Sequence, residues 1–189
     1  MYTDKPPRKT ALKDEYARSD EMRVLKLPPA EPLNKLCHEL QTALAAENRS
    51  KVQTSSKKIA ALVAEAYEIK APPIRILGER PLEEEGEIIH ETFGDYDFES
   101  TRIRLWMRTA RLGKVTAYGT FLSTLCHEIC HHLDVVSFEL PNTFHTRGFY
   151  ERAGLLYHYA KGTEQRPLVW DSLANGTYRI NWPKTMRIK

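Results

Sequence analysis

Residues 115–137 constrain the fold most, because they carry two different faces at helical spacing. Six apolar residues share one stripe of a helix that turns about 100° per residue: Tyr118, Leu122, Leu125, Ile129, Leu133 and Val136. His127 and His131 lie four residues apart on the opposite side. Such a helix buries its apolar stripe against a core and turns its polar face toward a cleft. The stretch therefore predicts the central helix of a folded domain with a polar site along its outer face.

Composition indicates one ordinary soluble domain. The chain has 189 residues, of which 41% are hydrophobic and 28% charged, so it can bury a core without disulfides. Its three cysteines are an odd number and do not form a secreted disulfide framework. No apolar run approaches about 18 residues, and residues 1–22 have no signal-peptide core. We expect a cytoplasmic protein with no membrane span, and the sequence gives no indication of its oligomeric state.

Periodicity and turn residues predict an α+β domain. Helices are expected at 31–44, 59–69, 115–137 and 144–160, a strand at 74–77, and a hairpin at 87–108 with Gly94–Asp97 in its turn region. A short mixed or antiparallel sheet would then pack against the histidine-bearing helix. We divide the chain into a flexible N-terminal arm (1–30) with at most a short helical patch, a central domain (31–160) and a basic extension (161–189).

The segment 101–108 alternates cleanly, as a half-buried strand does. Ile103, Leu105 and Met107 alternate with a basic face that comprises Arg102, Arg104, Trp106 and Arg108. The simpler interpretation is a strand whose basic face is solvated. The other is a strand whose exposed side guides a substrate.

The sequence His127-Glu128-Ile129-Cys130-His131 is an HExxH motif. Two histidines at this spacing reach a single metal ion from one helix face, and imidazole suits zinc. Zinc lowers the pKa of a bound water toward about 7, and a neighbouring carboxylate can accept the proton. The motif therefore predicts His127 and His131 as metal ligands, Glu128 as the general base, and peptide-bond hydrolysis as the reaction.

A catalytic zinc ion needs a third protein ligand. His145 follows His131 by 14 residues, after a turn at residues 140–142, and is the leading candidate. Glu151 lies 20 residues after His131 and is the alternative. The sequence alone leaves this choice open.

Other polar residues near the motif have simpler interpretations. Asp134 either orients a ligand imidazole or faces solvent, and His132 is expected to pack against the core through hydrogen bonds. Cys126 and Cys130 are expected to be small buried residues, although a closed Cys/His structural zinc site is an alternative. The residue that stabilises the oxyanion remains open among five candidates: Arg147, Tyr150, Arg152, Tyr157 and His158.

The HExxH motif, the following loop and "HTRGF" at residues 145–149 resemble the SprT-like zinc metallopeptidases, which carry HExxH, a similar loop and then HGxxF. His145 matches the third histidine and Phe149 the aromatic residue. Thr146 departs from the family's glycine, and no cysteine follows Cys130, so a zinc ribbon is absent. The resemblance covers roughly residues 55–160. It implies a zincin-like fold, peptidase activity on a protein or peptide substrate, and a substrate that pairs with the edge of the strand "STRIRLWMR".

Charge distribution supports a second hypothesis. Residues 161–189 carry 6 Lys or Arg and 2 Asp or Glu, whereas the whole chain has a net charge of +3. The basic extension, the arginine face and the tryptophans Trp106, Trp170 and Trp182 are compatible with nucleic acid as a partner. The alternative function is a nucleic-acid- or protein-binding module with a structural metal site.

Overall fold

The computed structural model describes residues 1–85 and 88–187 and has the predicted α+β fold. The described residues form six helices: α1 (Thr10–Glu21), α2 (Ala30–Ala45), α3 (Arg49–Ala66), α4 (Tyr118–Val136), α5 (Arg147–Lys161) and α6 (Trp182–Thr185). The strands are β1 (Ile74–Glu79), β2 (Leu82–Glu85), β3 (Ile88–Glu91), β4 (Gly94–Asp97), β5 (Arg102–Arg108), β6 (Trp170–Ser172) and β7 (Tyr178–Ile180). None of the described helices is both long and apolar enough to cross a membrane.

The main sheet is small and mixed, with the strand order β1-β5-β4. Strand β1 runs parallel to β5, and β4 pairs antiparallel with β5. β5, which contains most of "STRIRLWMR", is therefore the central strand, and both of its edges are paired. Strand β4 lies at one end of this order and has a free edge. The pairing of a substrate with the strand edge, which the resemblance implies, therefore does not apply to β5.

The segment Gly94–Asp97 is strand β4 rather than the expected turn. The turn starts at its last residue, because the carboxylate of Asp97 accepts hydrogen bonds from the backbone N–H groups of Glu99 and Ser100. A side chain that bonds the backbone two or three residues later is typical of an Asp-initiated turn. The turn of the hairpin consequently starts at Asp97 and not at Gly94.

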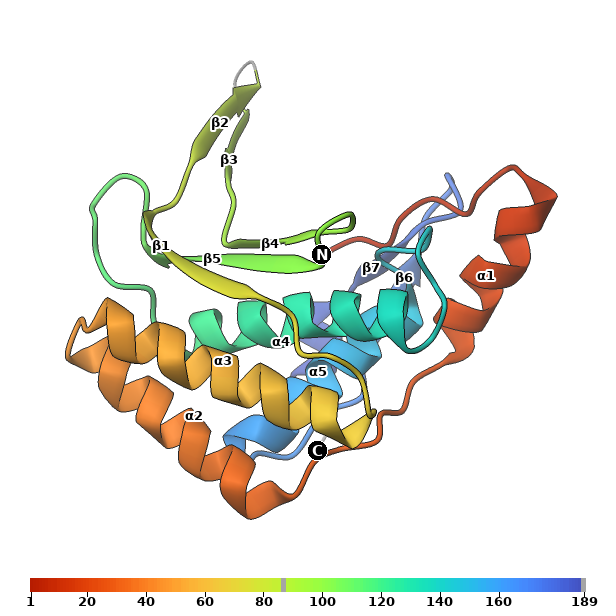
Figure 1. The fold of residues 1–189 in the computed structure, drawn as a ribbon. Coiled ribbons are helices and arrows are strands. Elements are labelled where there is room, and N and C mark those ends of the chain that lie inside the picture. The colour runs from red at the N-terminus through yellow and green to blue at the C-terminus, as the bar shows by residue number, and fades with distance from the viewer. Residues whose placement is uncertain (86–87, 188–189) are drawn as a thin grey trace.

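Helix α4 runs beneath the sheet (Figure 1) and is the centre of the core. The middle of its apolar stripe is buried as predicted, with Leu122, Leu125 and Ile129 at most 1% exposed, whereas Val136 at its end is 40% exposed. The inward residues of β5, Ile103 and Leu105, are 0% exposed. Helices α2 and α3 form a hairpin that packs against α4 and β1. The opposite face of α4 carries the histidines and packs against α5.

The N-terminal segment contains the twelve-residue helix α1, longer than the expected helical patch. This helix packs against α5 (Figure 1). Arg152 of α5 donates hydrogen bonds to the carbonyls of Ser19 and Met22 at the end of α1. Gly148 permits this approach, since a Cβ atom there would lie 2.0 Å from the Ser19 carbonyl oxygen. These partners lie more than 120 residues away in sequence, so no local pattern indicated them.

The C-terminal segment was expected to be irregular, but it forms the antiparallel pair β6 and β7 and the short helix α6. The N-terminal residues continue this pairing, because the N–H of Thr3 donates to the carbonyl of Tyr178. The N–H of Tyr178 in turn donates to the Thr3 hydroxyl. The N-terminal residues therefore meet β7 close to the histidines, since the carbonyl of His145 accepts a hydrogen bond from the N–H of Asp4.

Candidate metal centre

Three histidines converge on one point. His127 and His131 project from successive turns of α4, and their Nε2 atoms lie 3.1 Å apart. His145 approaches from the loop before α5 and places its Nε2 atom 3.2 Å from that of His127. The three ligand atoms lie within 4.8 Å of one another, so the group can hold a metal ion.

The spacing and protonation of the histidines both suit a metal. Two nitrogens bound to a tetrahedral ion at 2.0–2.1 Å are about 3.4 Å apart, close to the distances between the facing Nε2 atoms here. Burial, aided by His145, lowers the pKa of His127 to about 3. Burial and the neighbouring histidines lower the pKa of His131 to about 2. Both imidazoles are therefore neutral near pH 7, which is the form that binds metal.

The third member of the group is His145 and not Glu151. Helix α5 begins at Arg147 instead of the predicted Phe144, because Thr146 caps it by accepting a hydrogen bond from the N–H of Phe149. This cap leaves His145 in the preceding loop, where it can turn toward α4. Glu151 instead accepts hydrogen bonds from Arg23 and Trp170.

Asp4 is a site residue that the sequence did not indicate. Its carboxylate accepts a hydrogen bond from the N–H of His145 at 2.9 Å, and its own N–H donates to the carbonyl of His145 at 2.7 Å. A carboxylate oxygen of Asp4 also lies 3.6 Å from Nδ1 of His145. Carboxylates that contact ligand imidazoles commonly fix their orientation. The contact spans 141 residues of sequence, and no motif joins its two partners.

Phe149 forms the floor of the site. Its ring centroid lies 4.8 Å from that of His127, 4.4 Å from that of His131 and 5.3 Å from that of His145. The side chain is completely buried, so the three imidazoles rest on a rigid apolar surface. The aromatic residue four positions after His145 thus has a structural reason to be there.

Glu128 lies beside the histidines in a groove of about 570 Å³. This groove is bounded by α4 and by the start of β4, and its lining includes His127, Thr124, Phe93 and Gly94. Glu128 is only 5% exposed. Burial, together with the nearby Asp95, raises the pKa of Glu128 to about 8. A carboxyl group with a raised pKa in a cleft beside metal-binding residues is suited to proton transfer near neutral pH.

Asp134 neither contacts a ligand imidazole nor faces solvent. It is 1% exposed and accepts hydrogen bonds from Arg152 at 2.7 and 2.9 Å. Burial raises the pKa of the Asp134 carboxyl, and the Arg152 guanidinium counters that rise. This ion pair joins α4 to α5 at the helical turn that follows His131.

The remaining predictions about neighbouring residues hold in part. His132 is a buried packing residue, with Nδ1 3.1 Å from the Tyr96 hydroxyl and Nε2 2.8 Å from the Lys70 carbonyl oxygen. Cys126 and Cys130 are buried, free thiols outside the histidine group. Of the oxyanion candidates, Tyr157 lines the groove with His127, whereas Arg147 and Arg152 are engaged in ion pairs with Asp20 and Asp134.

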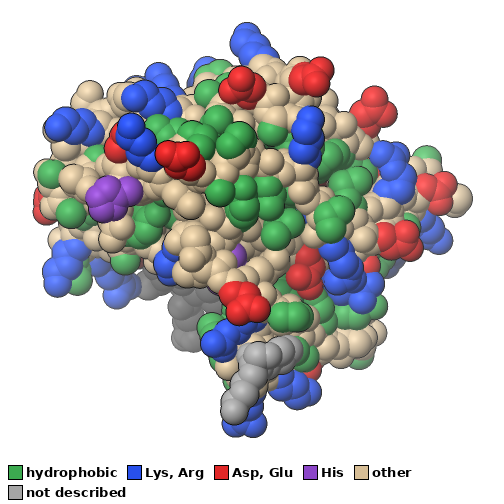
Figure 2. All heavy atoms as spheres, turned by 90° about the horizontal axis from the view of Figure 1, so that it is seen from below, with side chains coloured by type: hydrophobic (Ala, Val, Ile, Leu, Met, Phe, Trp, Pro, Cys, Tyr) green, Lys and Arg blue, Asp and Glu red, His purple; other side chains and the backbone are tan. Residues whose placement is uncertain are grey.

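The arginine face is largely paired with carboxylates. Arg104 contacts Asp95 at 2.5 Å, and Arg108 contacts Glu47 at 2.5 Å. Figure 2 shows one face of the molecule, where basic and acidic side chains are interspersed around a hydrophobic area. On that face the two signs of charge are mixed and do not form a continuous basic surface.

Comparisons with known proteins do not assign a family. No protein-family model matches the chain, and neither does any curated protein or solved structure.

Proposed function

We propose that this protein is a zinc-dependent metallopeptidase with a zincin-like domain, which hydrolyses peptide bonds in a protein or peptide substrate. The observation that carries the proposal is the convergence of His127, His131 and His145 on one point, with the buried Glu128 beside His127 in the lining of an adjoining groove. Three protein ligands that leave a fourth position open are typical of catalytic zinc, whereas structural zinc is usually enclosed by four ligands. The free cysteines of α4 lie outside the histidine group, so the closed Cys/His alternative has no support.

Each residue has a distinct role in this mechanism. His127, His131 and His145 would hold the ion, which supplies Lewis-acid activation of water and of the substrate carbonyl. Glu128 accepts the proton of the attacking water and passes it to the departing amine. Its burial keeps the carboxyl out of bulk water and raises its pKa. The positive charge of a bound ion would lower that pKa again and favour the carboxylate, which is the form that accepts a proton. Tyr157 is the candidate in the groove to donate a hydrogen bond to the oxyanion.

Strand β4 offers a way to align the substrate. It is the edge strand of the main sheet, and it packs against α4 at the groove that contains Glu128. An extended peptide can add to such an edge through backbone hydrogen bonds. Gly94 lets the start of this strand approach α4 closely, since a Cβ atom there would lie 2.6 Å from the Thr124 side chain.

The test is proteolysis of an unfolded protein substrate by the zinc-loaded chain and by two variants. Glu128→Gln removes the base and keeps the shape, so we expect the cleavage rate to fall at least about a hundredfold. Glu151→Gln makes the same chemical change outside the site and should cleave at the wild-type rate. Equal rates for wild type and Glu128→Gln would refute the role of Glu128, and no cleavage by the zinc-loaded wild type would refute the proposed function.

A further inference from the structure

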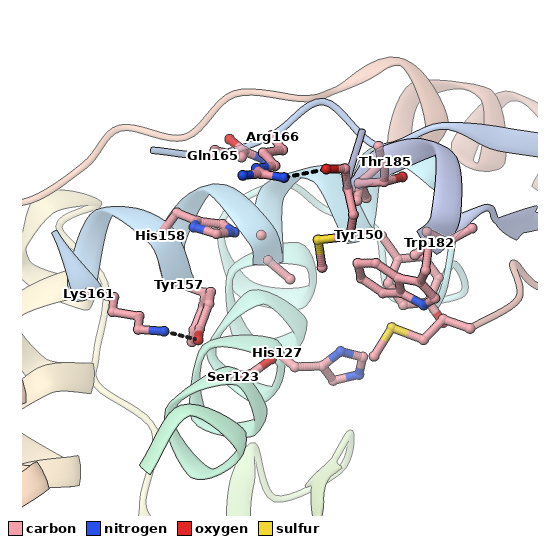
Figure 3. Close-up of a pocket in the computed structure, with 16 residues that line it drawn as sticks. Ser123, His127, Tyr150, Tyr157, His158, Lys161, Gln165, Arg166, Trp182 and Thr185 are labelled. Atoms are coloured by element: carbon pink, nitrogen blue, oxygen red, sulfur yellow. Dashed lines mark hydrogen bonds between the residues drawn. The ribbon is translucent and has the colours of Figure 1, made fainter. Parts of the chain in front are cut away.

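A pocket of about 380 Å³ opens beside His127, on the side facing α5 and the C-terminal segment, and we call it the side pocket. Figure 3 shows its lining, with His127 and Ser123 from α4, Tyr150 and Tyr157 from α5, and Trp182 from α6. Its volume lies within the range of pockets that hold small organic groups. The HExxH helix thus forms one wall, and residues 165–186 form the opposite wall.

The inner wall of the side pocket is mostly apolar. Besides the aromatic residues, it includes Ala153, Leu168, Ile180 and Met186. Gly154 widens it, since its missing side chain leaves space bounded only by the amide of Gln165 within 4 Å. A pocket of this size and lining favours a large apolar side chain, which gains free energy by leaving water.

The lining of the side pocket carries two positive charges. Lys161 lies beside Tyr157, and Arg166 lies beside Gln165 in another part of the lining (Figure 3). The Lys161 ammonium donates to the Tyr157 hydroxyl, and Arg166 donates to the Met186 carbonyl. Within the described chain neither forms an ion pair with a carboxylate, and no Asp or Glu lines the pocket. The side pocket therefore favours an anionic group on a ligand.

The side pocket adjoins the groove that contains Glu128. Four residues line both: Met1, Ser123, His127 and Tyr157. A peptide bond held at the histidines therefore has an adjacent side chain within reach of the side pocket. This shared wall links the side pocket to the choice of substrate.

We propose that the side pocket selects substrates with a large apolar residue next to the scissile bond and an acidic group beside that residue. The assignment rests on the proposed peptidase function for its role in cleavage. Binding to the side pocket can be measured without cleavage. The two ideas can therefore fail separately.

The test measures binding of three N-acetyl dipeptide amides, Phe-Asp, Gly-Asp and Phe-Lys, to the zinc-loaded protein by calorimetry. We expect Phe-Asp to bind about tenfold or more tightly than Gly-Asp, because the ring is buried. We also expect Phe-Asp to bind more tightly than Phe-Lys.

Gly154→Leu fills the side pocket and should remove the preference for phenylalanine. Ala61→Leu adds the same side chain on an exposed position of α3 and should leave it intact. Met186→Trp, at a 61% exposed position, narrows the pocket without disturbing the core.

Cleavage sites in an unfolded protein, mapped by mass spectrometry, complete the test. Enrichment of Phe, Leu or Met beside the cut, lost in Gly154→Leu, is the expected result. Equal binding of Phe-Asp and Gly-Asp by the wild type would overturn the inference, as would a preference unchanged in both pocket variants. Selective binding of Phe-Asp without any cleavage would support the side pocket and refute the proposed peptidase function.

Discussion

The buried ion pair between Arg152 and Asp134 gives the sharpest prediction about stability. Arg152 is 0% exposed and Asp134 1% exposed. The guanidinium donates two hydrogen bonds to the Asp134 carboxylate and two to the Ser19 and Met22 carbonyls of α1. Arg152→Met keeps most of the side-chain volume and removes these donors. The substitution would leave a buried carboxylate and two backbone carbonyls without their partner.

The expected loss in the free energy of unfolding follows from the burial of this ion pair. Removing one partner of a buried ion pair typically costs 3–5 kcal/mol, because an uncompensated charge remains. For a chain of this length, about 1 kcal/mol shifts the melting temperature by about 2–4 °C. Arg152→Met should therefore lower the melting temperature by about 6–20 °C. The double variant Arg152→Met/Asp134→Leu should recover much of the loss, since it removes both charges.

Urea denaturation followed by circular dichroism measures these free energies of unfolding. Arg104→Met is the matched control, because Arg104 pairs with Asp95 at a side chain that is 48% exposed. Exposed pairs contribute about 0–1 kcal/mol. The reasoning is refuted if Arg152→Met costs no more stability than Arg104→Met, or if the double variant is no more stable than Arg152→Met.

Three further predictions concern the N-terminal segment and the thiols. Asp4→Asn should weaken zinc binding about 10–100-fold in a chelator competition, whereas Asp14→Asn on the exposed side of α1 should not; equal affinities would exclude Asp4 as a positioning residue. Gly148→Ala should destabilise the protein by about 1–3 kcal/mol and expose residues 1–22 to limited proteolysis. Gly154→Ala is its control, because a Cβ there meets only a flexible side chain, and similar losses would contradict the close approach of α1. Burial raises the pKa of Cys37 to about 11, so this thiol should resist a thiol reagent at pH 8 until the chain is denatured. The folded chain holds that proton more tightly, so stability should fall as pH rises from about 8.5 toward 11, with a shallower fall in Cys37→Ala.

The sequence predicted the parts of the site that lie on one helix. Helical spacing alone placed His127 and His131 together, set Glu128 beside them and buried the stripe of Leu125 and Ile129. The α+β class followed from the same periodicity. These features depend on residues within a few helical turns of one another, and the spacing of such residues can be read from a single sequence.

Features that depend on distant partners were missed. Asp4 meets His145 only because the N-terminal residues pair with β7, and Arg152 meets Asp134 only because α5 folds back on α4. The choice between His145 and Glu151 depended on the cap at Thr146, which ends the loop one residue after His145. Sequence spacing fixes how far apart two residues are along the chain, whereas packing determines which side chains face each other.

The most direct test of the metal centre is zinc binding by the wild-type chain and by His145→Ala and Glu151→Ala, measured as bound zinc per chain and as affinity. The three convergent imidazoles predict one tightly bound ion per wild-type chain, a large loss of affinity in His145→Ala and no change in Glu151→Ala. A wild-type chain that binds no zinc, or a variant pair in which Glu151→Ala loses the metal and His145→Ala retains it, would contradict the account.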